Sequence, residues 1–429
     1  MQRGGDFRDV RITNTEWKPS RLDELGFVGR GKSRHRPRND ARLYGGPYPF
    51  IQTAEIMDAD PYITSHSQTY SEFGLQQSKL WPPNTLCITI AGANTAETAV
   101  LKFEACFPDS IVGFIPDEKK ADLHFIKYSL DLMRDKFRAV TRGATQDNLS
   151  LDKLLSFPLL MPPLPVQRRF AGILSAYDEL IENNQRRIKI LEEMARSLYR
   201  EWFVHFRFPS HDKVKMVPSP LGPIPQGWEV KEMQEVADVI DCLHSKKPEE
   251  CPDGSGIFLQ LNNIGDGGKL DMRKLFHISA KDYKRWTSRI ELQAGDCIVT
   301  NVGRVGAVAQ MPDGVKAAPG RNMTAIRPRA GQLTPTCLIE YLLSSHMISE
   351  VAKKKDLGTI MDSLNVKGII RLHVPCPPMD LMLKFESIAR PMRKRIEVLV
   401  EQTQNLRRTR DLLLPRLLSG QVSIEALQT

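Results

Sequence analysis

Residues 165–202, PVQRRFAGILSAYDELIENNQRRIKILEEMARSLYREW, decide the fold, because their apolar residues recur at steps of three and four. The stripe consists of Ile173, Tyr177, Leu180, Asn184, Ile188, Leu191, Met194, Leu198 and Trp202. Charged residues fill the positions between them, a pattern typical of a coiled-coil helix. The helix is predicted to begin at Pro165, after Pro162 and Pro163, and to stop before Pro209. Asn184 either fixes the register of the seam or faces water, and we expect the second.

The same stretch occurs a second time further along the chain. Adding 215 to each residue number carries Phe170 onto Phe385 and Leu191 onto Leu406, and the register holds without a gap from Gly143 to Phe203. The copy predicts a second long helix with Asp380 as its N-cap and with Pro415 and Gly420 at its end. Its stripe is Ile388, Met392, Ile396, Leu399, Thr403, Leu406 and Leu413. Neither stripe can be buried alone, so we expect the two helices to pack antiparallel, with a globular domain at each end.

The regions before the helices repeat more loosely, at offsets that drift between 208 and 213. In this alignment Trp17 corresponds to Trp228, and residues 50–52 correspond to residues 258–260. Strands are predicted at 86–90 and 296–300, each leading into a polar loop, and short helices at 124–136 and 337–353. The predicted fold is therefore α+β: two globular domains, residues 1–160 and 209–377, alternate with conserved helices at 161–208 and 378–429.

The composition is that of an ordinary globular protein with an excess of basic residues. Lys and Arg number 60 against 51 Asp and Glu, which gives a net charge of +9 that suits a polyanionic partner. The seven cysteines are scattered and form no C-x-x-C pair, which argues against a disulfide framework and a zinc site and for a reducing cytoplasm. We expect neither a signal peptide nor a membrane span.

Three further segments give the chain a family resemblance. These are the box GPIPQGWEV at 222–230, the run GKSRHRPRND at 31–40 followed by YPFIQT at 48–53, and the closing LLLPRLLSG at 412–420. Together with the repeated helices, they resemble the specificity (S) subunits of type I restriction-modification systems over nearly the whole chain. The residues before Trp17 have no counterpart that we can place.

The resemblance implies a non-catalytic subunit without a cofactor. It implies two target-recognition domains, each reading one half of a split site on double-stranded DNA. It also implies two docked methyltransferase subunits, with motor-nuclease (restriction) subunits added for restriction.

Two alternatives from other functional classes stay open at this point. The first is an NTPase, because GFVGRGKS at 26–33 satisfies the pattern G-x-x-x-x-G-K-S. A P-loop needs a buried strand before it and a helix after it, and the flanking sequences predict neither. The second alternative is a coiled-coil structural adaptor without a DNA role. A methyltransferase is disfavoured, because none of the three Pro-Pro pairs has the flanks that hold a flipped base, and the nine histidines form no metal motif.

The candidate DNA contacts are basic and amide side chains, since Lys and Arg bind phosphates and Arg, Asn, Gln and Thr read base edges. In the first domain they are Arg30, Lys32, Arg34, Arg36, Thr53, Lys79 and Asn94. In the second domain they are Lys246, Lys247, Asn262, Asn301, Arg304, Arg321 and Asn322. Each could equally be a solvated surface residue, and the run 353–355 is interpreted as a solvated helix end.

Overall fold

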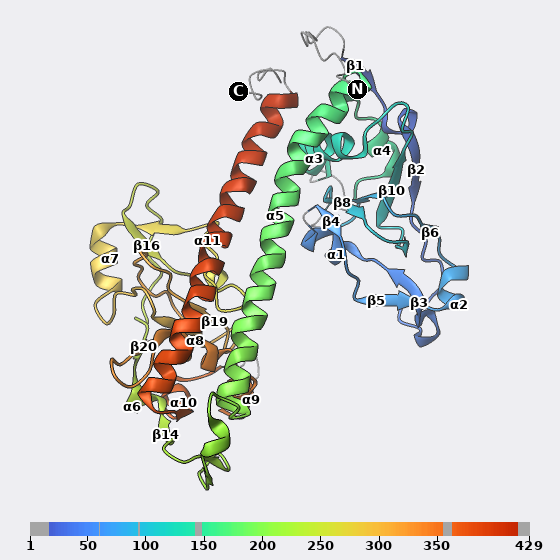
Figure 1. Ribbon diagram of the computed structural model, residues 1–429. Helices are drawn as coiled ribbons and strands as arrows, with labels where there is room; N and C mark the ends of the chain where they lie inside the picture. The colour runs from blue at the N-terminus through green and yellow to red at the C-terminus, as the bar shows by residue number, and fades with distance from the viewer. Residues whose placement is uncertain (1–16, 60, 93–94, 142–147, 355–362, 419–429) are drawn as a thin grey trace, which may run out of the picture. The chain divides into compact units, whose positions relative to one another are not determined.

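The computed structural model describes residues 17–59, 61–92, 95–141, 148–354 and 363–418 (Figure 1). The chain divides into two compact units. Unit 1 comprises Met1–Asn183 with Asn405–Thr429, and unit 2 comprises Asn184–Gln404. Each unit therefore contains part of both long helices as well as its own sheets. Asn94, Gly143, Lys355 and Gly420, which entered the predictions above, lie outside the described residues, as do residues 1–16.

Unit 1 is built on a five-stranded sheet with a buried centre. Its strand order is β2 (Gly26–Arg30), β10 (Ile111–Pro116), β7 (Leu86–Thr89), β8 (Thr98–Leu101) and β4 (Tyr62–Ile63). Every residue of β7 and β8 is buried, which explains why both segments are short apolar runs. Helix α3 (Leu123–Thr141) packs on β8 and adds Phe125 and Phe137 to the core.

Smaller elements complete unit 1. A second sheet has the order β5 (Gln68–Tyr70), β3 (Tyr44–Phe50), β9 (Ala105–Cys106) and β6 (Leu80–Trp81). The short helices are α1 (Thr53–Asp58), α2 (Glu72–Gln76) and α4 (Leu151–Leu155). The strand β1 (Lys18–Ser20) pairs with β11 (Leu159–Met161) just before the long helix begins.

Unit 2 repeats this plan with its own residues. Its main sheet has the order β15 (Ala237–Asp241), β20 (Met323–Pro328), β18 (Cys297–Thr300) and β19 (Val308–Gln310). The paired strands are β12 (Met216–Val217) with β13 (Ile224–Pro225), β14 (Glu229–Glu232) with β21 (His373–Cys376), and β16 (Gly256–Phe258) with β17 (Phe276–Ile278). The helices are α6 (Met233–Val236), η6 (Leu261–Asn263), α7 (Ala280–Trp286), α8 (Pro335–Leu342), α9 (Ser345–Lys354) and α10 (Val366–Ile370).

The two units match down to individual cross-strand pairs. Phe50 of β3 lies opposite Gln68 of β5, and Phe258 of β16 lies opposite Phe276 of β17, at the same offset of 208. The order β2-β10-β7-β8 in unit 1 corresponds to β15-β20-β18-β19 in unit 2. The predicted internal repeat is therefore confirmed in the globular parts as well as in the helices.

The long helices α5 (Leu164–Tyr199) and α11 (Met379–Leu418) pack against each other within each unit (Figure 1). In unit 1, Asp178 of α5 pairs with Arg410 of α11. In unit 2, Ile188 of α5 forms a cluster with Ile396 and Leu399 of α11. Rising numbers on α5 meet falling numbers on α11, so the pairing is antiparallel, as predicted. No helix among the described residues is long and apolar enough to cross a bilayer.

Several predicted helix details were wrong. Asp380 lies in the first turn of α11 and is not its N-cap, and α11 continues through Pro415 to Leu418. The reason for this continuation is tertiary: Leu417 is fully buried in the core of unit 1. The helix predicted at 337–353 is two helices, because the Ser344 hydroxyl accepts a hydrogen bond from the Met347 N–H and starts α9. Asn184 does not face water, since it is only 8% exposed.

Candidate DNA interface

A pocket of about 410 Å³ in unit 2 brings together four of the predicted DNA contacts. Its lining residues are Lys247, Phe258, Leu259, Gln260, Leu261, Asn262, Arg321 and Asn322. The segments 258–262 and 321–322, two of the three that line it, are held close by the hydrogen bond from Leu259 N–H to Ala318 O, at 3.0 Å. A Cβ at Gly320 would lie 1.9 Å from Leu259 O, so only glycine permits this close approach.

Lys247 is held in this pocket from two sides. Its Nζ lies 3.9 Å from the centroid of the Phe276 ring and donates a 2.8 Å hydrogen bond to Gln260 Oε1. Arg321 and Asn262 are exposed, and Asn322 adopts a positive φ of 62°, a conformation that asparagine tolerates. The pocket therefore presents cationic and amide side chains, the types that bind phosphates and base edges. Lys246 is also exposed, next to the pocket residue Lys247 in the chain.

The other two candidates in unit 2 have internal contacts. The Asn301 amide donates to Thr324 Oγ1 at 3.0 Å and to Leu364 O at 2.7 Å, which ties it to the frame of the domain. Arg304 forms an ion pair with Asp266 and donates to Ile264 O at 2.9 Å. Its guanidinium stays largely exposed, so Arg304 can still reach a phosphate.

In unit 1 the candidates lie along β2 and the loop after it. The Arg30 guanidinium donates to Asp109 O at 2.7 and 3.0 Å, and the guanidinium of Arg38 pairs with the Asp109 carboxylate at 2.9 Å. Lys32 and Arg34 are exposed, while Arg36, also exposed, donates to Ser33 O at 2.7 Å.

Lys79 and Thr53 complete the unit 1 candidates that the structure describes. The Lys79 Nζ lies 3.7 Å from the centroid of the Trp81 ring and 4.3 Å from that of Phe27. Burial, and next the charge of nearby Lys32, lowers the pKa of Lys79. Thr53 begins α1, directly after Gln52.

The segment 26–33 is not a phosphate-binding loop. Residues 26–30 form the strand β2, whereas a P-loop requires a loop between a strand and a helix. The described residues 31–40 that follow contain no helix. A Cβ at Gly31 would lie 2.3 Å from Phe107 O, so this glycine permits a close approach of two backbone segments. The NTPase alternative is therefore wrong.

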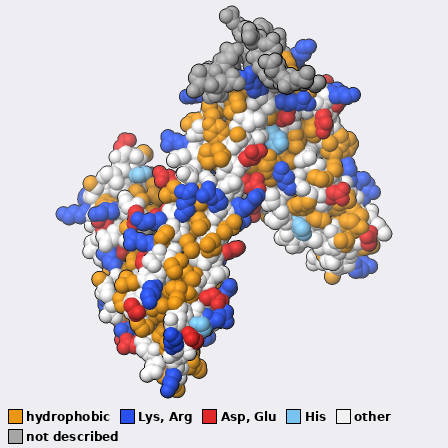
Figure 2. All heavy atoms as spheres, viewed as in Figure 1, with side chains coloured by type: hydrophobic (Ala, Val, Ile, Leu, Met, Phe, Trp, Pro, Cys, Tyr) orange, Lys and Arg blue, Asp and Glu red, His pale blue; other side chains and the backbone are white. Residues whose placement is uncertain are grey.

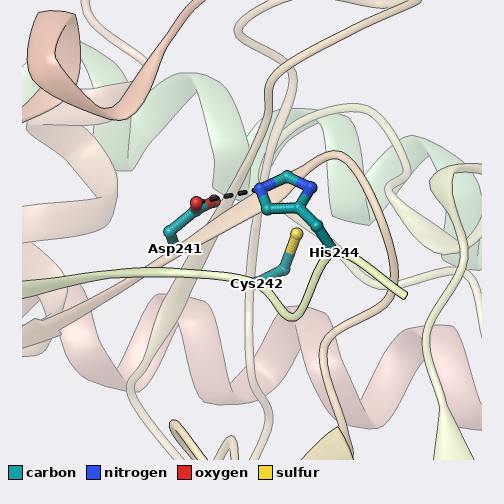
Figure 3. A group of neighbouring side chains, drawn as sticks. All are labelled: Asp241, Cys242 and His244. Carbon is teal, nitrogen blue, oxygen red and sulfur yellow. Dashed lines mark hydrogen bonds and ion pairs between the residues drawn. The ribbon is translucent and has the colours of Figure 1, made fainter.

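Sequence reasoning missed a group of potential metal ligands at the end of β15. The donor atoms of Asp241, Cys242 and His244 lie within 4.8 Å of one another, and the side chains of Asp241 and His244 share a 2.9 Å hydrogen bond (Figure 3). However, burial raises the pKa of the Cys242 thiol, and Arg289 lies 3.8 Å from the Asp241 carboxylate. Both features oppose binding of a cation, and the internal contacts account for the cluster.

Sequence reasoning also did not select Gln52 and Gln260. In both copies the strand ends, one buried apolar residue follows, and the glutamine comes next. The two glutamines therefore occupy the same place in the repeat. The signal was present, because the matched runs 50–52 and 258–260 both end in glutamine.

Comparisons with known proteins agree with this architecture. The family model of the type I restriction modification DNA specificity domain matches residues 14–193. The specificity subunit of type I restriction enzyme MjaIX from Methanocaldococcus jannaschii is 23% identical, with 98% of this chain and 96% of that protein covered. The MjaVIII specificity subunit of the same organism is 22% identical, with 89% and 88% covered.

The crystal structure of a type I S subunit from M. genitalium has the same fold. It matches at a TM-score of 0.57 and 16% identity, covering 95% of this chain and 98% of that one. The relatives, the family model and the duplicated sheets around paired long helices all point to the same family. They exclude the alternative of a structural adaptor. The chain therefore belongs to the type I restriction-modification specificity (S) subunits, the non-catalytic subunits that provide DNA specificity in these enzymes.

Proposed function

We propose that each unit reads one half of a bipartite site on double-stranded DNA. The proposal rests on one observation: equivalent surface positions in the two units carry different side chains on the same frame. Asp109 in unit 1 occupies the place of Arg321 in unit 2, at the offset of 212 that relates β10 to β20. Likewise, Gln68 occupies the place of Phe276. Two copies of one frame with exchanged side chains suit two readers of different base sequences.

The chain is part of a type I restriction-modification complex, and the partners that we propose are two methyltransferase subunits, with restriction subunits added for cleavage. A groove of about 680 Å³ on α11 in unit 2 supports a docking role. Leu383, Pro391 and Val398 give it an apolar floor, and Arg390, Lys394 and Arg395 add positive charge. Figure 2 shows hydrophobic side chains gathered over this course of α11. The groove suits a methyltransferase segment with apolar and acidic side chains.

The purified chain should transfer no methyl group to DNA from a methyl donor until the methyltransferase is added. Leu383→Asp should then weaken methyltransferase binding by roughly tenfold or more, because it places a charge in the apolar groove. Leu383 is 55% exposed, so the fold should survive. Titration of labelled methyltransferase measures the affinity. Ile348→Asp on α9 is the matched control, since Ile348 is also exposed. Methylation by the isolated chain, or equal affinity for both variants, would contradict this account of docking.

A further inference from the structure

Gln52 and Gln260 are held by the same device in both units. Ile51 and Leu259, which precede them, are fully buried and anchor the backbone through hydrogen bonds to Cys106 O at 2.9 Å and Ala318 O at 3.0 Å. Each glutamine then occupies the N-cap position of a short helix, and its backbone N–H donates to the side chain of the residue three positions later. The position of the glutamine backbone is therefore fixed in both domains.

In unit 2 the capping partner is itself rigid. The Gln260 N–H donates to Asn263 Oδ1 at 2.9 Å, and the Asn263 side chain, 2% exposed, donates to Asp271 O and Lys274 O. In unit 1 the Gln52 N–H donates to Glu55 Oε2 at 3.0 Å, and Ser67 donates to the same carboxylate. A side chain that reads a base needs such supporting hydrogen bonds to fix its position.

Capping alone does not explain glutamine at these positions. Ser, Thr, Asp and Asn are the preferred N-cap residues, because their shorter side chains reach the backbone N–H groups with less loss of freedom. Both copies nevertheless carry glutamine, whose longer side chain extends to the surface of the domain. In unit 2 that surface is the wall of the 410 Å³ pocket.

The pocket offers hydrogen-bond donors more than acceptors. Gln260 Oε1 accepts from Lys247 Nζ at 2.8 Å, so the Nε2 group is the end of the amide that can meet a ligand. Arg321 and Lys247 add further donors, and the described residues that line the pocket include no acidic side chain. Guanine is the base that presents two acceptors, N7 and O6, in the major groove.

We propose that Gln260, with Arg321 beside it, reads the acceptor edge of a guanine in the half-site of unit 2. Gln52 occupies the corresponding reading position in unit 1, where its Nε2 donates to Gln68 Oε1 at 2.8 Å and Asp109 replaces Arg321. This inference rests on the proposed function, in which each unit reads one half-site.

The test uses the full chain reconstituted with its methyltransferase and maps methylated sites on genomic DNA. Gln260→Glu keeps an oxygen that can accept from Lys247, but it replaces the amide donor with a carboxylate that the guanine acceptors repel. Discrimination at one guanine position of the unit 2 half-site should fall by roughly 5- to 150-fold, and the other half-site should stay unchanged.

Two matched variants serve as controls. Gln52→Glu should alter the other half-site only. Gln332→Glu should alter neither, although Gln332 also accepts a hydrogen bond from a lysine, Lys231, at 3.2 Å. Near-identical unfolding midpoints of the three variants would show that the fold is intact.

A second measurement decides the case in which Gln260→Glu abolishes all methylation. The unaltered complex is tested on duplexes with 7-deazaguanine, which lacks the N7 acceptor, at each guanine of the unit 2 half-site in turn. We expect a single position to lose binding. A half-site without guanine, tolerance of every substitution, or a Gln260→Glu variant with unchanged specificity would overturn the inference. A native site that is not bipartite would instead refute the proposed function.

Discussion

At the scale of single residues, one pair of equivalent buried positions in the two units carries opposite charges. Asp178 on α5 and Arg393 on α11 are equivalent at the offset of 215, and both are buried. Asp178, 1% exposed, accepts from Arg410 at 2.6 Å and from the Tyr128 hydroxyl. Arg393 donates to Glu340 at 2.7 Å and to Gly267 O at 2.9 Å. Because the polar partners differ, each helix segment satisfies its buried charge only in its own unit.

Arg393→Met should destabilise unit 2 by about 3–5 kcal/mol at pH 7, because the fully buried Glu340 loses its counter-charge. Burial already raises the pKa of Glu340, and this substitution should raise it further. An acid whose pKa is higher in the folded state favours folding at low pH, so the deficit should shrink as the pH falls from 7 to 5. Urea unfolding with hydrogen exchange resolved by unit measures this. Recovery should follow from Arg393→Met with Glu340→Leu. A deficit of equal size in unit 1 would contradict this account.

Sequence patterns could predict part of the candidate interface. Lys247, Asn262, Arg321 and Asn322 were selected by residue type and loop position, and the structure brings them together. Asn301 was selected on the same grounds, but its amide donates a hydrogen bond to the backbone of its own domain. That contact could not be predicted locally, because the partner lies 63 residues away in the sequence. Gln260 was not selected, although glutamine can read base edges and the repeat aligns it with Gln52, because the hydrogen bonds that hold it are formed only in the fold.

At the scale of elements, the long helices were predictable because their periodicity is local and repeated. Their ends were not, because Leu417 is buried against unit 1 residues distant in the sequence, and this burial carries α11 past Pro415. Both helices run unbroken through the boundary between the units, α5 at 183–184 and α11 at 404–405. A continuous helix pair resists changes in length, so we expect it to set the spacer between the half-sites.

Inserting seven residues after Asn183 and another seven after Gln404 keeps both seams in register, since seven residues are two turns of a coiled coil. Each helix should lengthen by about 10 Å at 1.5 Å per residue. At about 3.4 Å per base pair, the unread spacer should grow by about three base pairs, with both half-sites unchanged. Methylome sequencing measures the spacer. An insertion of two residues in each helix, which turns the seam by about half a turn, is the control and should abolish activity. An active seven-residue variant with the original spacer would show that the helices do not measure the gap.

At the scale of the whole molecule, duplication separates the side chains that build the fold from those that we propose read DNA. The strand order β2-β10-β7-β8 of unit 1 recurs as β15-β20-β18-β19 in unit 2, whereas Asp109 and Arg321, or Gln68 and Phe276, differ at equivalent positions. We therefore expect that side chains on the proposed reading surface can change without disturbing the core. This arrangement is predictable from the sequence only as a repeat with drifting offsets, since the bases that each surface reads depend on docking geometry and DNA shape.

The most direct test of this account exchanges residues 17–150 for the corresponding segment of a relative with a different known site. The chimaera is combined with the methyltransferase, and every methylated position in genomic DNA is mapped. The account predicts that one half-site becomes that of the relative, while the other half-site and the spacer between them stay as they were. If both half-sites changed together, or if neither changed in an active complex, the two units would not be independent readers.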